Sequence, residues 1–228
     1  MEIIPIAYFH SPLTSKFGIP KQAGIVNELE GTIVFQPAFR NIDAIRGLNE
    51  FDYLWIIWQF SANKHSANSL IVRPPRLGGN EKVGVFASRS PFRPNPIGLS
   101  SVKIVSIDND TSLGPVIKVR GADIMDGTPI YDIKPYITFA DSHPEAKSGF
   151  VDTNEWQKLN VSIPEEIKSE LISKIGEDKY NALYEILRED PRPQYQKDPQ
   201  RQYGMPFESL DIHFRIIGNN LRVINVIF

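Results

Sequence analysis

The 228-residue chain has no cysteine, which excludes disulfide bonds, thiolate nucleophiles and zinc sites built on cysteine ligands. It also has no excess of positive charge, because its formal net charge is −2 at pH 7. A binding site for nucleic acid must therefore come from local clustering of basic residues. An apolar content of 41%, with 11% aromatic residues, is typical of a packed globular protein.

Long hydrophobic runs are missing as well. The longest apolar segment, residues 53–60, is interrupted by Gln59 and is far too short to cross a bilayer. The first ten residues, MEIIPIAYFH, lack the basic segment and the small-residue cleavage site of a signal peptide. We therefore expect a cytoplasmic protein with no membrane association.

Several common catalytic motifs are absent. The chain has no GxGxxG after a strand, no GxxxxGK[ST] and no GxSxG, so Rossmann dinucleotide sites, P-loops and the nucleophile elbow of serine hydrolases have no support. The four histidines are scattered and none pairs at the spacing of metal ligands, so we expect no metal site. An enzyme of this composition would depend on positioning and electrostatics, with or without a bound cofactor.

Short segments rich in Val, Ile and aromatic residues dominate the first two-thirds of the chain, and they predict β-strands. They are residues 3–9, 32–35, 53–60, 82–88, 100–107, 116–119 and 129–133. No long helix separates them, which favours a barrel or a sandwich. Residues 43–49 predict one short helix with Asn41 or Asp43 as its cap.

The pattern changes after residue 142. Residues 143–160 are polar and predict a linker. Ser162 and Glu165 form a capping-box pattern at the start of a helix, and a second short helix follows, which Asp190 and Pro191 end. Residues 210–216 and 221–228 predict a hairpin. We therefore expect a first domain at residues 1–142, a linker at 143–160, and an α+β domain of two helices and a hairpin at 161–228.

The middle of the chain carries a cluster of positive charge on stiff loops. Its basic residues are Arg73, Arg76, Lys82, Arg89 and Arg93, opposed only by Glu81. A guanidinium group matches phosphate or carboxylate oxygens, and a loop stiffened by proline loses less entropy on binding. The alternative is that these arginines are solvated and that the prolines only shape turns.

Two further segments combine turns with polar groups. DGTP at residues 126–129 predicts a tight turn, whose carbonyls and hydroxyl could also meet a ligand. DPRPQY at residues 190–195 ends a helix, and it also sets Arg192 between prolines near Tyr195. Such a pair could bind a phosphate and stack on a base.

With RPPRLGGN, VGVFASRSPFRPNPIGLS, DGTPIYDIKPY and DPRPQY, the chain resembles the TrmO family (TsaA-like or YaeB-like) of tRNA methyltransferases over nearly its whole length. The resemblance implies a mainly β fold with a single-sheeted β-barrel. It implies S-adenosylmethionine (AdoMet) as the cofactor, bound close to the interface of a homodimer. The implied reaction is N6-methylation of N6-threonylcarbamoyladenosine (t6A) at position 37 of tRNA, which gives m6t6A.

The resemblance also places functional residues on this chain by position. Those implied for AdoMet are Gln22, Ala23, Gly24, Ser61, Ala62, Arg89, Leu99, Asp126, Gly127, Thr128 and Pro129. Relatives carry a His-Gln pair where this chain has Ser61 and Ala62, which puts the side-chain contacts there in doubt.

Roles follow from the chemistry of these groups. Arg89 suits a carboxylate or an RNA phosphate, and Leu99 could wall the adenine. Asp126, with Tyr195 as the alternative, is the candidate that removes the N6 proton. The candidates for tRNA contact are Arg73, Arg76, Arg93 and Arg192. The rival hypotheses are a non-catalytic AdoMet- or RNA-binding module, and an AdoMet enzyme acting on a small molecule.

Overall fold

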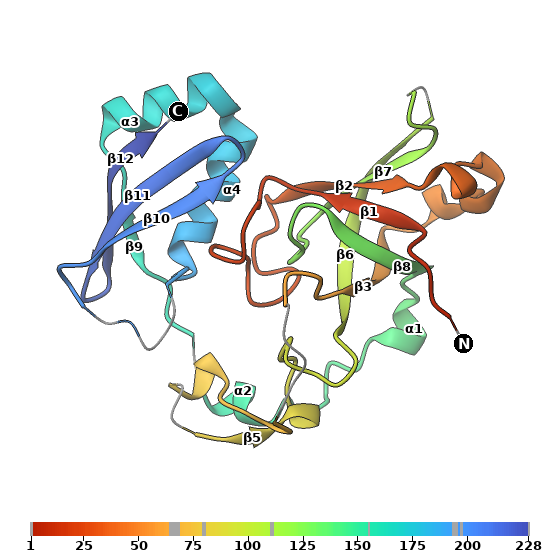
Figure 1. The fold of residues 1–228 in the computed structure, drawn as a ribbon, viewed down its shortest axis with the longest axis horizontal. Helices are drawn as coiled ribbons and strands as arrows, with labels where there is room; N and C mark the ends of the chain where they lie inside the picture. Colours follow the sequence, from red (N-terminus) through yellow and green to blue (C-terminus); the bar gives the residue numbers. More distant parts are fainter. Residues whose placement is uncertain are drawn as a thin grey trace.

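The computed structural model describes residues 2–63, 69–78, 81–109, 112–154, 156–192, 196 and 198–227. Its N-terminal part is a closed barrel in which antiparallel strands follow the order β1-β2-β7-β6-β3-β8 (Figure 1). The strands are β1 (Ala7–His10), β2 (Glu30–Phe35), β3 (Tyr53–Gln59), β6 (Ile97–Asp108), β7 (Val116–Arg120) and β8 (Thr128–Pro135). The expectation of a mainly β fold with a single-sheeted barrel is confirmed.

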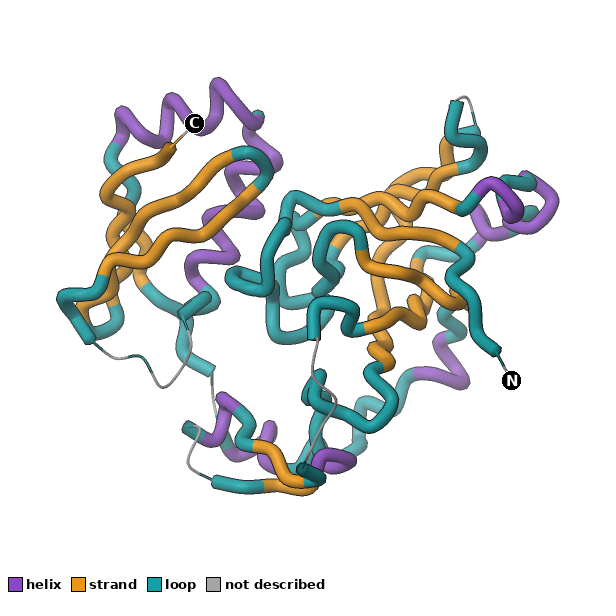
Figure 2. Tube along the Cα trace, in the orientation of Figure 1, coloured by secondary structure: helices purple, strands orange, loops and turns teal. Residues whose placement is uncertain are grey.

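Alternating side chains fill the barrel. Leu54, Ile56 and Trp58 of β3 are buried, while the residues between them are more exposed, as expected where one face of a strand lines a core. Trp58 fits because Gly98 stands beside it on β6, where an added Cβ would lie 2.3 Å from the indole ring. Long loops rather than helices connect most of these strands (Figure 2).

The C-terminal part is a four-stranded sheet of order β10-β11-β12-β9 with two helices on one face (Figure 1). Its elements are β9 (Asn160–Ser162), α3 (Glu165–Ile175), α4 (Glu177–Arg188), β10 (Gln202–Phe207), β11 (Leu210–Ile217) and β12 (Asn220–Ile227). The two helices and the hairpin were predicted. The outer strands β9 and β10 were missed, since β9 is three residues long and β10 contains Gly204 and Pro206.

A third, small lobe lies below both parts in Figure 1. It contains β4 (Ile71–Val72), β5 (Val83–Gly84) and α2 (Phe150–Thr153), and the Arg76 Nε donates to the Asn154 carbonyl at 2.7 Å to join its two chain segments. The short helix α1 (Thr138–Asp141) is tied to the barrel, because the Trp55 Nε1 donates to Asp141 at 3.0 Å. Short 3-10 turns also form at Pro37–Phe39 and Pro75–Leu77.

Several local predictions were wrong. Residues 82–88, predicted as one strand, form only the two-residue strand β5 and then a 3-10 turn at Val85–Ala87. Extended pairing begins at Ala7, after Pro5, rather than at residue 3. The predicted linker holds α2 and the start of β9.

Two helix starts also differ from the prediction. Ser162 lies in β9 and makes no cap, because Pro164 occupies the N-cap position of α3 without a side-chain hydrogen bond. The helix predicted at residues 43–49 is two 3-10 turns, Ile42–Ile45 and Leu48–Glu50. Gly47, with φ of 85°, separates them, while Asn41 caps the first as predicted.

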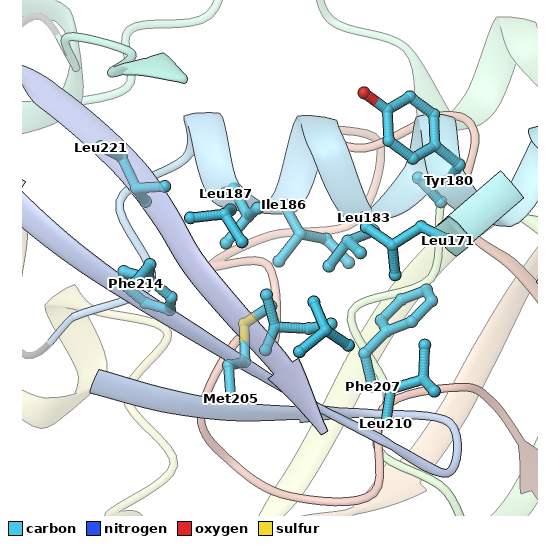
Figure 3. Packing of buried hydrophobic residues seen from close by; sticks show 14 of the residues in the cluster. Leu171, Tyr180, Leu183, Ile186, Leu187, Met205, Phe207, Leu210, Phe214 and Leu221 are labelled. Carbon is cyan, nitrogen blue, oxygen red and sulfur yellow. The ribbon is translucent and has the colours of Figure 1, made fainter. Parts of the chain in front are cut away.

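The β1–β2 loop (residues 11–29) shares the core of the C-terminal sheet, while the barrel strands enclose a separate core. Leu13, Val26 and Leu29 of this loop belong to the same buried cluster as the C-terminal helices and strands, part of which is shown in Figure 3. Gly18 touches that cluster so closely that an added Cβ would lie 2.5 Å from the Met205 sulfur. The Glu208 N–H donates to the Pro12 carbonyl at 2.7 Å. No helix of the described residues is long and apolar enough to span a membrane.

This shared core predicts a long-range effect of a barrel-loop mutation. Leu13 is completely buried, so Leu13→Ala should lower the free energy of unfolding by about 2–5 kcal/mol. Urea denaturation followed by far-UV circular dichroism measures this, and the loss should appear in the helical signal of the C-terminal part. Leu113→Ala, at a side chain that is 43% exposed, is the control and should change stability by less than about 0.5 kcal/mol. Equal effects of the two variants would contradict the shared core.

Candidate cofactor and RNA site

Two chain segments meet at one end of the barrel. They are the β1–β2 loop and the connection between β7 and β8. The Gly24 N–H donates to the Gly121 carbonyl at 2.8 Å, and the Asp126 N–H donates to the Leu13 carbonyl at the same distance. Residues 22–24 and the 126–129 turn, both predicted for AdoMet, are thus anchored on the same pair of segments.

Arg89 joins this place from a distant part of the sequence. Its Nη1 donates to the Gln22 Oε1 at 2.5 Å, and both side chains remain in contact with solvent. The structure therefore brings together two residues that the family resemblance assigned to the cofactor, 67 positions apart. The guanidinium keeps unpaired N–H donors for an anionic ligand.

A hydrogen-bonded chain runs from the barrel interior to this loop. The buried Trp58 Nε1 donates to the Ser100 Oγ at 2.9 Å, and the Ser100 hydroxyl donates to Asp123 at 2.5 Å. Burial raises the pKa of the Asp123 carboxyl above its usual range. The Ser100 hydrogen bond, the backbone N–H of Ala23 and the Arg89 charge oppose that rise. Asp123 thus connects both the loop and Arg89 to the barrel core.

Sequence analysis assigned no role to Asp123. An aspartate near a turn carries no local signal that it is buried, and its partners lie 23 residues away or more.

The predicted turn at 126–129 is present, with Gly127 at φ of 70°. The Asp126 Oδ1 accepts from the Ser11 N–H at 3.1 Å and lies 3.3 Å from the His10 Nδ1. Thr128 is only 2% exposed, so its hydroxyl is not open to a ligand as the sequence suggested. Pro129 lies in β8 opposite Tyr8.

Ser61, Ala62 and Leu99 lie at the β3–β6 side of the barrel. Ser61 follows the end of β3, where its N–H donates to the Gln59 carbonyl at 2.7 Å. Leu99 pairs with Ile57 and is 56% exposed on the outer surface, whereas its neighbour Ser100 points inward. Within the described chain, no hydrogen bond joins these three residues to Gln22 or Asp126.

The groups at this end of the barrel fit the chemistry of AdoMet. Gly24 and Gly127 have open space where a Cβ would stand, so a ligand can approach their backbone closely. Arg89 offers a cation for a carboxylate, and Asp126 offers oxygens for hydroxyl or ammonium groups.

The four arginines predicted for RNA have different surroundings. The Arg93 Nη1 donates to the carbonyls of Ser88 at 2.6 Å and Val85 at 3.1 Å, so it braces its own loop. Arg76 binds the Asn154 carbonyl. Arg73 is exposed and has no hydrogen bond or ion pair in the part of the chain that the structure describes.

Arg192 pairs with Asp190 at 3.0 Å and is mostly buried. The other member of that predicted pair, Tyr195, lies outside the described residues together with Pro193 and Gln194.

A pocket of about 360 Å³ lies between the β1–β2 loop and the end of α4. Lys21, Pro75, Asp190 and Arg192 are among its lining residues, so Pro75 and residues 190–192 border the same pocket. One of its lining residues, Lys21, directly precedes Gln22 in the chain.

Lys21 is the residue of this pocket that sequence analysis missed. Its ammonium group lies over the Trp156 ring, 3.3 Å from the ring centroid, and donates to the Asp190 carbonyl at 3.5 Å. Lys21 is exposed as a whole residue, but loss of hydration at its ammonium group lowers the Lys21 pKa to about 8, although Asp190 and Glu189 favour the charge. No local pattern could reveal a contact between residues so far apart in the chain.

Comparison with known proteins identifies the family. The family model described as the tRNA-methyltransferase O N-terminal domain matches residues 8–142, and the TrmO C-terminal domain model matches residues 156–227. The chain belongs to the TrmO family. The relationship inferred from the sequence motifs is therefore confirmed.

Individual TrmO relatives agree over nearly full length. The chain is 36% identical to the tRNA (adenine(37)-N6)-methyltransferase of Escherichia coli, over 96% of this chain and 94% of the relative. It is 34% identical to a putative S-adenosylmethionine-dependent methyltransferase of Pseudomonas aeruginosa, over 98% and 96%. The crystal structure of TrmO from Pseudomonas aeruginosa superimposes with a TM-score of 0.79 at 27% identity, covering 100% of this chain and 99% of that one.

The raised pKa of Asp123 predicts a pH dependence of stability. Because the folded protein holds this proton more tightly than the unfolded chain, the free energy of unfolding falls as pH rises above 3.8 towards the folded pKa. Asp123→Asn keeps an acceptor for Ser100 but carries no charge. We therefore expect it to gain stability relative to the wild type as pH rises through this window, which denaturation at a series of pH values measures. Asp152→Asn, outside the network, is the control, and an unchanged pH profile in Asp123→Asn would contradict the prediction.

Lys21 predicts the opposite slope at alkaline pH. Its folded pKa of about 8 lies below the ordinary 10.5, so the unfolded chain binds more protons between these values. The free energy of unfolding should therefore rise with pH across this window, and Lys21→Met should remove that rise. Urea titrations between pH 7.5 and 10.5 measure it. Lys16→Met should retain the wild-type rise. A Lys21→Met variant that also retains it would contradict the assignment of this rise to Lys21.

Proposed function

We propose that the chain is an AdoMet-dependent enzyme that methylates N6 of t6A at position 37 of tRNA and forms m6t6A. The observation that carries the proposal is the contact between Arg89 and Gln22, beside the loop–barrel connection at Gly24 and Gly121, in a chain of the TrmO family. The relatives named tRNA (adenine(37)-N6)-methyltransferase support the choice of the base and the position.

AdoMet is held at the end of the barrel. Arg89 would bind its carboxylate, the backbone of residues 22–24 and of the 126–129 turn would contact its adenosine, and the exposed Leu99 would contribute apolar surface. Ser61 and Ala62 contribute backbone contacts, because they lack the His-Gln side chains of the relatives. When bound, AdoMet supplies an electrophilic methyl group.

The residues of the chain position the acceptor and take its proton. AdoMet would supply the methyl group, so that an N6–C bond would form as the S–CH3 bond breaks and S-adenosylhomocysteine leaves. N6 is conjugated with a carbonyl and is a weak nucleophile, so its proton must also be removed. Asp126 accepts that proton. It is partly exposed and its Oδ1 is held by Ser11 and His10, so the carboxylate has a fixed orientation. Tyr195 remains the alternative acceptor.

The tRNA is held by the arginines around the pocket. Arg73, which has no partner among the described residues, binds phosphate. Arg192 lines the pocket, and Arg76 directly follows Pro75, which also lines it. Arg93 shapes the loop that carries Arg89. Unstacked bases of an anticodon loop suit such rigid arginines.

The enzyme acts as a homodimer in the cytoplasm. Exposed Ile97 and Leu99 on the outer wall of β6 support an interface beside the cofactor. A non-catalytic AdoMet- or RNA-binding module is the rival hypothesis, and it requires no ordered carboxylate at the turn.

The proposal predicts a defined product. Incubation of the protein with AdoMet and tRNA carrying t6A should convert t6A to m6t6A, which mass spectrometry of digested nucleosides detects. The same tRNA without t6A should not react. Arg89→Gln should lower the rate at subsaturating AdoMet, because the carboxylate loses its ion pair. AdoMet binding and tRNA binding without any methylated product would favour the non-catalytic module.

A further inference from the structure

One face of the C-terminal sheet is covered by no other layer of the described residues. The barrel loop and both helices pack on the other face, through the shared cluster of Figure 3. On the open face, Arg215 of β11 lies directly opposite Arg222 of β12, and both side chains are exposed. The two arginines line one pocket of about 490 Å³.

Two like charges opposite one another on neighbouring strands repel, because such side chains are about 5 Å apart at Cβ. Nothing in the described part of the chain relieves this repulsion. Neither arginine has a hydrogen bond or an ion pair there, and no residue that lines the pocket carries a carboxylate. By contrast, Arg120 is paired with Glu30 at 3.0 Å.

The pair belongs to a longer row of polar groups across the sheet. Gln202 of β10 stands opposite Arg215, and Ser162 of β9 stands opposite Arg222. The row therefore crosses all four strands, with neighbouring strands about 4.8 Å apart. Ile217, which is 63% exposed, borders it on the pocket side.

We propose that this open face, through Arg215 and Arg222, is a second RNA-binding surface that holds backbone phosphates of the tRNA. Its charge complements a polyanion, and a phosphate between the two guanidinium groups removes their repulsion. The inference rests on the proposed function, which makes tRNA the substrate.

The surface contacts a part of the tRNA away from the reacting base. It lies on the side of the sheet opposite to the barrel loop, and that loop carries residues 22–24 of the cofactor site. Phosphate contacts of this kind orient an RNA and carry no sequence information. The site therefore increases affinity for the whole tRNA and leaves the choice of base to the barrel end.

Binding of an unmodified tRNA transcript at several salt concentrations tests the proposal. Each of Arg215→Gln and Arg222→Gln should reduce the slope of log K against log salt by about 1. The double variant should weaken binding at low salt by about 10- to 100-fold. Arg46→Gln, at an exposed barrel arginine, is the matched control and should leave both quantities unchanged.

Two readouts separate this surface from the cofactor site and from misfolding. AdoMet affinity by calorimetry should be unchanged in the double variant, and its thermal midpoint should not fall, since repulsion is relieved. The absence of native cysteine permits a third: Asn220→Cys labelled with a photo-crosslinker should crosslink to tRNA, whereas Glu50→Cys should not.

Wild-type affinity and salt slope in the double variant, or no crosslink from position 220, would overturn the proposal while the methylation assay still stands. A wild-type protein that binds no tRNA would overturn the proposed function and this surface together. Crosslinking of position 220 to an acidic peptide but not to tRNA would show that the partner is a protein.

Discussion

Burial of the β1–β2 loop between the barrel and the C-terminal sheet is the interaction on which the rest of the structure depends. Leu13, Val26 and Leu29 complete a core that the C-terminal helices and strands do not close alone. The same loop carries Gln22 to Arg89 and Lys21 to Trp156. Apolar packing thus holds polar groups that their own short-range contacts could not position, and it makes the candidate site sensitive to both parts of the chain.

A second constraint is the placement of charge at the barrel end. The Asp123 carboxylate loses hydration there, which disfavours its charged form. The hydrogen bond from Ser100 and the charge of the nearby Arg89 offset part of this loss. Arg89 therefore interacts both with the Asp123 carboxylate, through its charge, and with the Gln22 side-chain amide, through a hydrogen bond. Under the proposed function, the carboxylate of AdoMet would compete with these partners for the Arg89 guanidinium.

The barrel was predictable because its strands are short, rich in Val, Ile and aromatic residues, and bounded by turn residues, as in residues 53–60 and 116–119. The C-terminal hairpin was predictable because apolar and polar residues alternate in residues 210–216, with Gly218 at the turn. The failures fall where local composition and tertiary pairing disagree. Val83 and its neighbours have strand-like side chains, yet only a two-residue partner is available, and β10 pairs despite Gly204 and Pro206.

Only those residues of the candidate site that lie in recognisable motifs were predicted. The family resemblance predicted Gln22 and Arg89, and a hydrogen bond joins them in the structure. Asp123 and Lys21 depend on partners distant in the chain, Ser100 and Trp156, so no spacing rule could reveal them. Thr128 shows the converse, because its motif suggested an available hydroxyl that the fold buries.

The arginines show how internal partners separate structural from binding roles. The sequence suggested Arg93 as the RNA-directed member of a stiff loop, and in the structure its Nη1 donates to two backbone carbonyls of that loop. The prolines alone do not account for the stiffness of that loop, because the Arg93 side chain also hydrogen-bonds to the backbone carbonyls of Val85 and Ser88. The sequence predicted no role for Arg215 and Arg222, because exposed polar residues are expected at alternate positions of a hairpin. The two arginines have no partner among the described residues and lie opposite one another on an open sheet, an arrangement that folding does not favour and that a bound anion would stabilise. The density of arginines along the chain is therefore a poorer guide to a binding surface than the absence of internal partners for them.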